Sequence, residues 1–326
     1  MKVFITREIP QTGIVLLQNA GISFTEWIEK RDLEQYELIE ICKKYDALIS
    51  VGQDKIDKHF LNECRHLKVI AQMAVGYDNI DIPEATKLKI PIGNTPGVLS
   101  NATADTAFLL MLAVSRKAFF MHKKIISRQW GFYEPIANLG IELHGKTLGI
   151  FGLGKIGFEM AKRCAKAFEM KIIYHNRNNN AQAEKELNAK KVSFEELLAQ
   201  SDVLSVHTAL TAETKNIFDS NAFSKMKPSA IFINTARGAI HNENDLINAL
   251  NEEMIWGAGL DVTNPEPMRS DNPLLEMPNV AVLPHIGSAT EETRGAMSRL
   301  VAENIIAASA GKRLPHIVNG EVYENK

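Results

Sequence analysis

The fold is decided by Gly152-Leu153-Gly154-Lys155-Ile156-Gly157, a G-x-G-x-x-G sequence. It follows an apolar stretch, residues 147–151, that is typical of a buried strand, and it leads into a helix-like segment, residues 158–168. In that setting the glycines indicate dinucleotide binding: one permits the tight turn, one admits the pyrophosphate, and one lets helix pack on strand. The helix N-terminus also offers unpaired N–H groups to phosphates. Almost half of the chain precedes this loop, which predicts a further unit in front of it.

The composition is that of an ordinary globular protein. The chain has 326 residues, 45% hydrophobic and 23% charged, with a formal net charge of −2, which argues against a nucleic-acid partner. The longest wholly apolar run, residues 107–114, is far shorter than the roughly 18 residues of a membrane span, so no membrane partner is expected. Three scattered cysteines predict reduced thiols, and the histidines show no metal-ligand spacing. Together with an N-terminus that lacks a signal-peptide pattern, this predicts a cytoplasmic protein without a metal.

Strand-like and helix-like segments alternate along the whole chain, which predicts an α/β fold with parallel sheets. One long helix over residues 103–127 is expected to leave the first unit, and a helix over residues 290–310 to return to it. The first unit is then discontinuous, with the second inserted into it. The predicted strands are 3–5, 47–51, 69–73, 90–93 and 316–318 in the first unit, and 147–151, 171–174, 202–206, 230–234, 257–262 and 280–284 in the second.

Three side chains of complementary chemistry follow three successive strands of the second unit. They are Arg237, Glu266 and His285, a cation, a carboxylate and an imidazole. Ligands of open α/β sheets bind at the carboxyl ends of the strands. Taken singly, Arg237 could cap a helix, Glu266 could be a solvated turn residue and His285 a satisfied loop histidine. Together they favour a catalytic site.

Further motifs lie in order along the chain. They are Ala74-Val75-Gly76-Tyr77-Asp78-Asn79, Asn94-Thr95-Pro96-Gly97, Asn234-Thr235-Ala236-Arg237-Gly238, Gly259-Leu260-Asp261-Val262 with Glu266-Pro267, and Leu283-Pro284-His285-Ile286-Gly287-Ser288. With the glycine loop they resemble the NAD(P)-dependent D-2-hydroxyacid dehydrogenases. The resemblance runs from about residue 3 to residue 318, and an ordered set of this kind is very specific. It implies two Rossmann-like, doubly wound α/β domains, with an NAD(P)-binding domain (101–289) inserted into a discontinuous, flavodoxin-like substrate domain (1–100 and 290–326), and a homodimer.

The resemblance implies a role for each matching residue. Arg237 would hold the substrate carboxylate and polarise the carbonyl, and the backbone N–H groups of Val75 and Gly76 would also hold the carboxylate. His285 would be the general acid and base, and Glu266 would keep it protonated for reduction near neutral pH. The cofactor-binding residues would be Thr103, Gly152, Gly154, Lys155, Ile156, Gly157, Asn176, Arg177, His207, Thr208, Thr235, Ala236, Asp261 (near the nicotinamide carboxamide) and Gly287.

The strand after the glycine loop predicts which dinucleotide binds. An NAD site has Asp or Glu about 20 residues past the loop, bonded to the ribose 2′-OH. Here that position is His175, followed by Asn176, Arg177 and Asn178. Without a carboxylate a 2′-phosphate is not repelled, and Arg177 offers it a donor. The sequence therefore favours NADP(H). The alternative is that Arg177 is solvated and the enzyme also takes NAD(H).

The substrate expected from this branch of the family is a small 2-oxoacid, glyoxylate or hydroxypyruvate, reduced to a D-2-hydroxyacid. A 2-ketogluconate reductase and a hydroxyphenylpyruvate reductase remain open, as does a dinucleotide-sensing binding protein of the same fold. Formate dehydrogenases have Gln where Glu266 stands and are disfavoured. Trp130, with Phe132 and Tyr133, either packs within the subunit or reaches the active site of a partner subunit.

Overall fold

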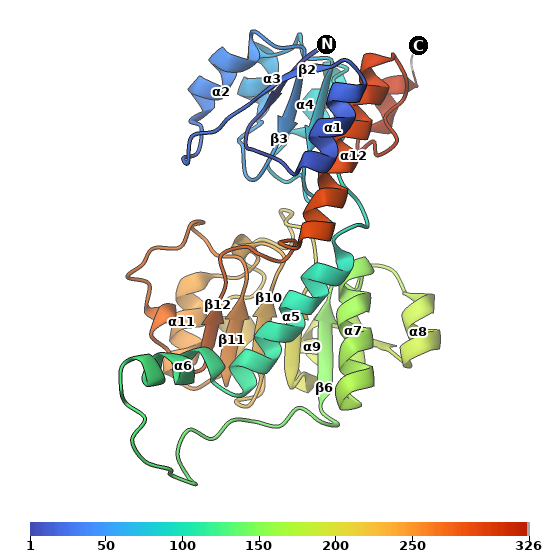
Figure 1. Ribbon diagram of the computed structural model, residues 1–326. Coiled ribbons are helices and arrows are strands. Elements are labelled where there is room, and N and C mark those ends of the chain that lie inside the picture. Colours follow the sequence, from blue (N-terminus) through green and yellow to red (C-terminus); the bar gives the residue numbers. More distant parts are fainter. Residues whose placement is uncertain (325–326) are drawn as a thin grey trace. The chain divides into compact units, whose positions relative to one another are not determined.

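The computed structural model describes residues 1–324 and divides into two compact units (Figure 1). The first unit comprises residues 1–99 and the described residues from 289 onward, and the second comprises residues 100–288. Each unit is built on one parallel sheet with helices on both faces, so the predicted α/β class is confirmed. None of the helices in the described residues has the length and apolar character that crossing a membrane requires.

The sheet of the first unit has five strands in the order β2-β1-β3-β4-β5. This is the flavodoxin-like order, as predicted. Every residue of β3 and β4 is buried, because helices cover both faces of the sheet. The strands are β1 (Lys2–Ile5), β2 (Ser23–Glu26), β3 (Ala47–Ser50), β4 (Val69–Gln72) and β5 (Ile92–Gly93).

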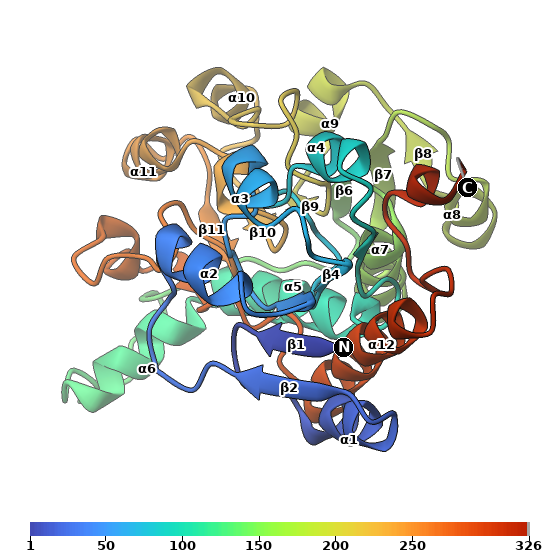
Figure 2. The same ribbon diagram turned by 90° about the horizontal axis from the view of Figure 1, so that it is seen from above.

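Two helices cover one face of this sheet, and three cover the other (Figure 2). On the first face α1 and α12 pack closely, because Gly13 leaves room for Ser298, whose Oγ accepts the Gly13 N–H over 3.0 Å. Through this contact α12, which follows the second unit in sequence, is part of the first. The helices are α1 (Gln11–Asn19) and α12 (Glu291–Ser309) on one face, and α2 (Gln35–Cys42), α3 (Lys58–Glu63) and α4 (Ile82–Lys87) on the other.

The sheet of the second unit has seven strands in the order β12-β11-β10-β9-β6-β7-β8. From β8 to β11 this is the 3-2-1-4-5-6 order of the Rossmann fold, and its direction reverses between β6 and β9. The strands are β6 (Thr147–Phe151), β7 (Lys171–His175), β8 (Lys190–Lys191), β9 (Val203–Val206), β10 (Ile231–Asn234), β11 (Gly257–Leu260) and β12 (Val280–Val282).

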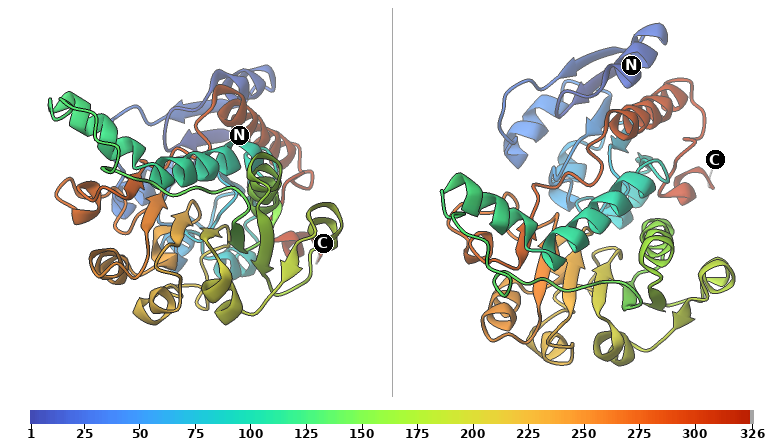
Figure 3. Two further views of the ribbon diagram at one scale, coloured as in Figure 1. Left: turned by 90° about the horizontal axis from the view of Figure 1, so that it is seen from below. Right: turned by 60° about the horizontal axis from the view of Figure 1, so that its bottom comes forward.

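Two apolar clusters, one on each face, hold the helices of the second unit to its sheet. The first lies under α5 and α7, and the second under α9, α10 and α11. Helix α6 extends away from the strands and begins an exposed segment (Figure 3). The helices are α5 (Ser100–Ser115), α6 (Ala118–Ile126), α7 (Lys155–Phe168), α8 (Ala181–Leu187), α9 (Phe194–Gln200), α10 (Ser220–Ser224) and α11 (Glu243–Asn251).

Two predictions about single elements were wrong, and two short strands at sheet edges, β2 and β8, were not predicted. The helix expected over residues 103–127 is two helices, because Lys117 has a left-handed backbone (φ 53°) that an α-helix cannot continue through. The strand expected at residues 316–318 forms only an isolated antiparallel bridge, between Gly93 and Ile317.

Candidate active site

The predicted site residues of the second unit gather at the carboxyl ends of its parallel strands. Strand β6 leads into the glycine loop, β7 into residues 175–180, and β9 into His207 and Thr208. Strands β10, β11 and β12 lead into the segments that carry Arg237, Glu266 and His285. The sheet order reverses between β6 and β9, which is where open α/β sheets leave a crevice for ligands.

The three glycines of the loop are required for different reasons. Gly152 has φ +96°, and a Cβ there would lie 2.8 Å from the backbone of His207. A Cβ on Gly157 would lie 2.8 Å from the Gly152 carbonyl oxygen. Gly154, the N-cap of α7, has an ordinary backbone, and a Cβ there would meet no atom within 4 Å. Packing therefore explains the first and third glycines, and the open space at Gly154, beside the first N–H groups of α7, fits a phosphate group.

The segment after β7 is fastened to the glycine loop. The Asn176 side chain accepts from the Leu153 N–H (2.7 Å) and donates to the Leu153 carbonyl oxygen (3.3 Å). Asn180, which the sequence analysis did not select, donates to the same oxygen over 3.0 Å. Asn176 is thus largely engaged in supporting the loop, whereas Arg177 is exposed. Lys191, also not selected, donates to the Arg177 carbonyl oxygen over 3.0 Å.

His207 is a neutral side chain in this site. Its Nε2 lies 2.8 Å from the Ser205 hydroxyl and its Nδ1 lies 3.5 Å from the Thr235 hydroxyl. Desolvation lowers the pKa of His207 to about 3. It therefore stays uncharged at neutral pH and can line a cofactor, but it is a poor proton carrier there.

The segment that carries Arg237 packs directly on the segment that carries Glu266. A Cβ on Gly238, the residue after Arg237, would overlap the Thr263 backbone carbonyl. The half-buried Arg237 donates from Nη1 to the Ala236 carbonyl oxygen over 2.8 Å, and its positive charge also lowers the pKa of Glu266. The predicted cation and carboxylate are therefore close enough to interact.

His285 and Glu266 are hydrogen-bonded to each other just past the end of β12. The Nδ1 of His285 lies 2.5 Å from Oε1 of Glu266. Burial raises the pKa of Glu266, but the hydrogen bond and the charge of His285 outweigh it, and the pKa is lowered. Because Glu266 occupies Nδ1, Nε2 is the nitrogen that can exchange a proton with a ligand. The backbone of His285 is left-handed (φ 55°), which is uncommon for a residue other than glycine and is found at functional sites.

A cavity of about 390 Å³ adjoins this pair. Its lining combines the polar groups of Asp261, Thr263, Glu266 and His285 with apolar side chains. Such a mixture is typical of a site for a small organic ligand. The apolar lining residues are Pro267, Met268, Leu275, Val282, Leu283 and Pro284.

Asp261 holds the segment that carries His285. Both of its carboxylate oxygens accept backbone N–H groups, from Ile286 (2.8 Å) and Gly287 (2.7 Å). The Thr103 hydroxyl donates to the Gly287 carbonyl oxygen over 3.2 Å. Burial raises the pKa of Asp261 despite these bonds. The structure thus gives Asp261 a positioning role that the sequence analysis, which expected it near the nicotinamide, did not anticipate.

Val75 and Gly76 lie in the first unit, just past the end of β4. Both are partly exposed. The Val75 carbonyl oxygen accepts from the Asn94 side chain over 2.9 Å, and the neighbouring Ala74 carbonyl accepts from the Thr95 N–H over 3.0 Å. Two of the recognised motifs therefore support each other within this unit.

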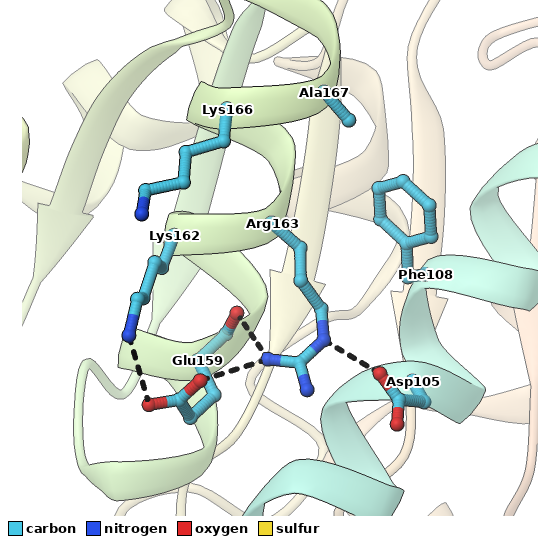
Figure 4. A pocket seen from close by; sticks show the side chains of 7 residues that line it. All are labelled: Asp105, Phe108, Glu159, Lys162, Arg163, Lys166 and Ala167. Atoms are coloured by element: carbon cyan, nitrogen blue, oxygen red, sulfur yellow. Dashed lines mark hydrogen bonds and ion pairs between the residues drawn. The ribbon is translucent and has the colours of Figure 1, made fainter.

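A second cavity, of about 550 Å³, lies between α5 and α7 and contains none of the strand-end residues (Figure 4). Its lining has two carboxylates and three cations. Arg163 bonds Asp105 over 2.6 Å and Glu159 over 2.9 Å, and Lys162 lies 4.0 Å from Glu159. None of the residues in the recognised motifs lines this cavity, so it is separate from the candidate site at the strand ends.

Comparison with known proteins gives a consistent picture. The D-isomer specific 2-hydroxyacid dehydrogenase NAD binding domain matches residues 108–287. A glyoxylate reductase from Thermococcus litoralis is 47% identical over 325 residues, covering 98% of this chain and 97% of the relative. The structure of a glyoxylate reductase from Paecilomyes thermophila has a TM-score of 0.86 at 36% identity, covering 100% of this chain and 99% of that one. An NADPH-dependent glyoxylate/hydroxypyruvate reductase from Sinorhizobium meliloti, solved with NADP and malonate, has a TM-score of 0.84 at 28% identity, covering 98% and 97%.

Proposed function

Since this chain belongs to the D-isomer specific 2-hydroxyacid dehydrogenase family of NAD(P)-dependent oxidoreductases, we propose that it reduces small 2-oxoacids, glyoxylate and hydroxypyruvate, with a preference for NADPH. The observation that carries the proposal is the hydrogen-bonded pair of His285 and Glu266 beside the segment of Arg237. The names of the relatives, glyoxylate reductases at 40–47% identity, support the choice of substrate.

The side chains divide the reaction among themselves. Arg237 would bind the substrate carboxylate and polarise the carbonyl oxygen with its planar guanidinium. His285 would donate its Nε2 proton to that oxygen in reduction and take it back in oxidation. Glu266 would stabilise the imidazolium through Nδ1. Gly154 and the N-terminus of α7 would hold the pyrophosphate of the dinucleotide, which, when bound, supplies the hydride.

A panel assay tests this function. Glyoxylate, hydroxypyruvate, 2-ketogluconate and hydroxyphenylpyruvate are each offered with NADPH and with NADH, and kcat/KM is measured. We expect glyoxylate and hydroxypyruvate with NADPH to be the best pairs. Tight NADPH binding without turnover of any 2-oxoacid would instead favour a dinucleotide-sensing protein.

The preference for NADPH is proposed from the segment after β7. His175 stands where an NAD site has its acidic residue; its ring stacks on Phe151 and its Nδ1 lies 3.0 Å from the Val192 carbonyl oxygen, so this position does not place a carboxylate against a 2′-phosphate. Arg177 is exposed beside it. An Arg177→Ala variant should raise KM for NADPH by about tenfold or more and KM for NADH by less than about twofold, since a charge-assisted bond is worth roughly 1.5–3 kcal/mol. Equal changes for both cofactors would show that Arg177 does not recognise the 2′-phosphate.

A Glu266→Gln variant should lower kcat/KM for glyoxylate reduction by about tenfold or more. The lowered pKa of Glu266 keeps this carboxylate ionised at neutral pH, where its negative charge can stabilise the positive charge that an acid–base imidazole carries during the cycle. The neutral amide of glutamine keeps a hydrogen bond to Nδ1 but removes that charge. A native kcat/KM in this variant would contradict a role for the pair.

We propose that the protein acts as a homodimer through α6 and the segment after it. Large hydrophobic side chains concentrate there in exposed positions, which monomers rarely tolerate. Trp130, at 74% exposure, does not fit packing within one subunit. Sedimentation should give a dimer for the native chain and a monomer for the triple variant Trp130→Ser, Phe132→Ser, Ile136→Ser; a native monomer would overturn the proposal. The exposed residues are Ile125, Ile126, Trp130, Phe132, Tyr133, Ile136 and Leu139.

The proposed location is the cytoplasm. The three cysteines, Cys42, Cys64 and Cys164, are free and buried, which agrees with a reducing compartment.

A further inference from the structure

Asn234, the last residue of β10, closes the short segment that ends at Arg237. Its side-chain oxygen accepts the Ala236 N–H over 2.9 Å, and its Nδ2 donates to the Arg237 carbonyl oxygen over 2.9 Å. The Ala236 carbonyl oxygen in turn accepts from the Arg237 guanidinium. Asn234 is fully buried, so water does not compete for these bonds. The backbone direction at Arg237, just past the end of β10, therefore depends on the orientation of the Asn234 side-chain amide.

His241 forms a hydrogen bond with the second N–H of the Asn234 side-chain amide. Its Nδ1 lies 3.1 Å from the Asn234 Nδ2, and the ring, 1% exposed, packs edge-on against Phe232. Burial lowers the pKa of His241 to about 4, so the ring is neutral at pH 7. An amide NH₂ group can only donate, so Nδ1 accepts and the ring proton is on Nε2.

The other side of the ring has no such contact. Among the described residues, the buried Nε2 has no hydrogen-bond partner. A buried N–H without a partner costs roughly 1–3 kcal/mol, so stability alone does not account for a histidine at this position. What the ring does provide is an acceptor that fixes the Asn234 amide: with the amide reversed, its oxygen would face the Arg237 carbonyl oxygen and the His241 lone pair.

We infer that His241 is a positioning residue for Arg237 and acts through the Asn234 amide. This inference rests on the substrate-binding role proposed for Arg237. At 1% exposure His241 offers almost no surface to a substrate or a cofactor. Its role is to keep the peptide groups on either side of Arg237 in the geometry that aims the guanidinium at a carboxylate.

Two substitutions of similar volume separate this role from packing. His241→Gln retains an acceptor for Asn234, and His241→Leu does not. We expect the Leu variant to raise KM for glyoxylate about tenfold, with a smaller change in kcat, and the Gln variant to stay within about threefold of the native protein. Both should bind NADPH with a dissociation constant within about twofold of native and melt within a few degrees of it. A native KM in the Leu variant, or equal losses in both variants with a lowered Tm, would overturn the inference.

A double-mutant cycle tests the route through Asn234. In an Asn234→Ala background, adding His241→Leu should change KM for glyoxylate by less than about twofold; an undiminished tenfold effect would overturn the inference.

Oxamate, which carries a carboxylate beside a carbonyl but is not reduced, gives a readout free of turnover. Calorimetry on the NADPH-loaded protein should show weaker oxamate binding in the Leu variant only. If the native protein neither binds oxamate nor reduces any 2-oxoacid, the proposed function fails and the inference with it. If the native protein does both and the Leu variant matches it, the inference alone fails.

Discussion

Replacing His285 with asparagine or alanine is expected to lower kcat for the proposed glyoxylate reduction by about 10²- to 10⁴-fold, because the proposed proton donor to the carbonyl oxygen is lost. Asparagine is the sharper variant, since it tolerates the left-handed backbone at this position (φ 55°) better than alanine does. Steady-state kinetics measure the loss. The NADPH dissociation constant, followed by nucleotide fluorescence, should stay within about twofold of the native value.

A matched control is available in the same unit. His144 is exposed, and its Nδ1 faces only the Phe168 carbonyl oxygen over 3.3 Å. His144→Ala should leave kcat and KM unchanged. If the His285 variants keep full turnover, the acid–base role proposed for His285 is wrong, whatever the effect at His144.

Alanine substitutions in the glycine loop are expected to separate folding from cofactor binding. Gly154→Ala should melt at the native temperature without cofactor, because its Cβ meets no protein atom within 4 Å. Its NADPH dissociation constant should rise at least about tenfold, since the methyl group occupies the approach to the α7 N-terminus. Gly152→Ala should lower the stability by about 2 kcal/mol or more, because φ is +96° and the Cβ meets the His207 backbone at 2.8 Å.

The two variants check each other when thermal melts and NADPH titrations are run on both. A destabilised Gly154→Ala variant would mean that the protein itself needs this glycine. A stable Gly154→Ala variant with native NADPH affinity would remove the phosphate site from this loop.

The sequence predicted the parallel sheets well, because their strands are continuous apolar runs. It missed β2, Ser23-Phe24-Thr25-Glu26, because this strand pairs only with β1 at the edge of the sheet and has no buried residue. The break between α5 and α6 was missed for another reason. Arg116 and Lys117 are both good helix formers, and their backbone is set by contacts distant in sequence, such as the bond from the Ile141 N–H to the Ser115 carbonyl oxygen.

For the site, motif reasoning selected the residues to which the proposed chemistry is assigned. It did not select the residues that hold them in place. The bonds of Asp261 to the backbone of residues 286 and 287, and of Asn180 to Leu153, join segments more than 20 residues apart, so no local pattern announces them. In the sequence, Asn180 could be recognised only as the residue that caps the start of a helix, since its side chain accepts the Ala183 N–H at the beginning of α8.

The absence of a side chain at Gly238 restricts how this protein can be redesigned or can diverge. The segments of Arg237 and Glu266 meet there with no space for one added carbon atom, so neither can be lengthened or re-angled without displacing the other. Substitutions of Met268 and Leu275, in the apolar lining of the neighbouring cavity, are therefore the better route to new substrates. Side-chain volume can change there while the charged groups keep their positions. A library that varies those two positions should keep acid–base chemistry in most of its members, whereas one that varies residue 238 should lose it almost everywhere.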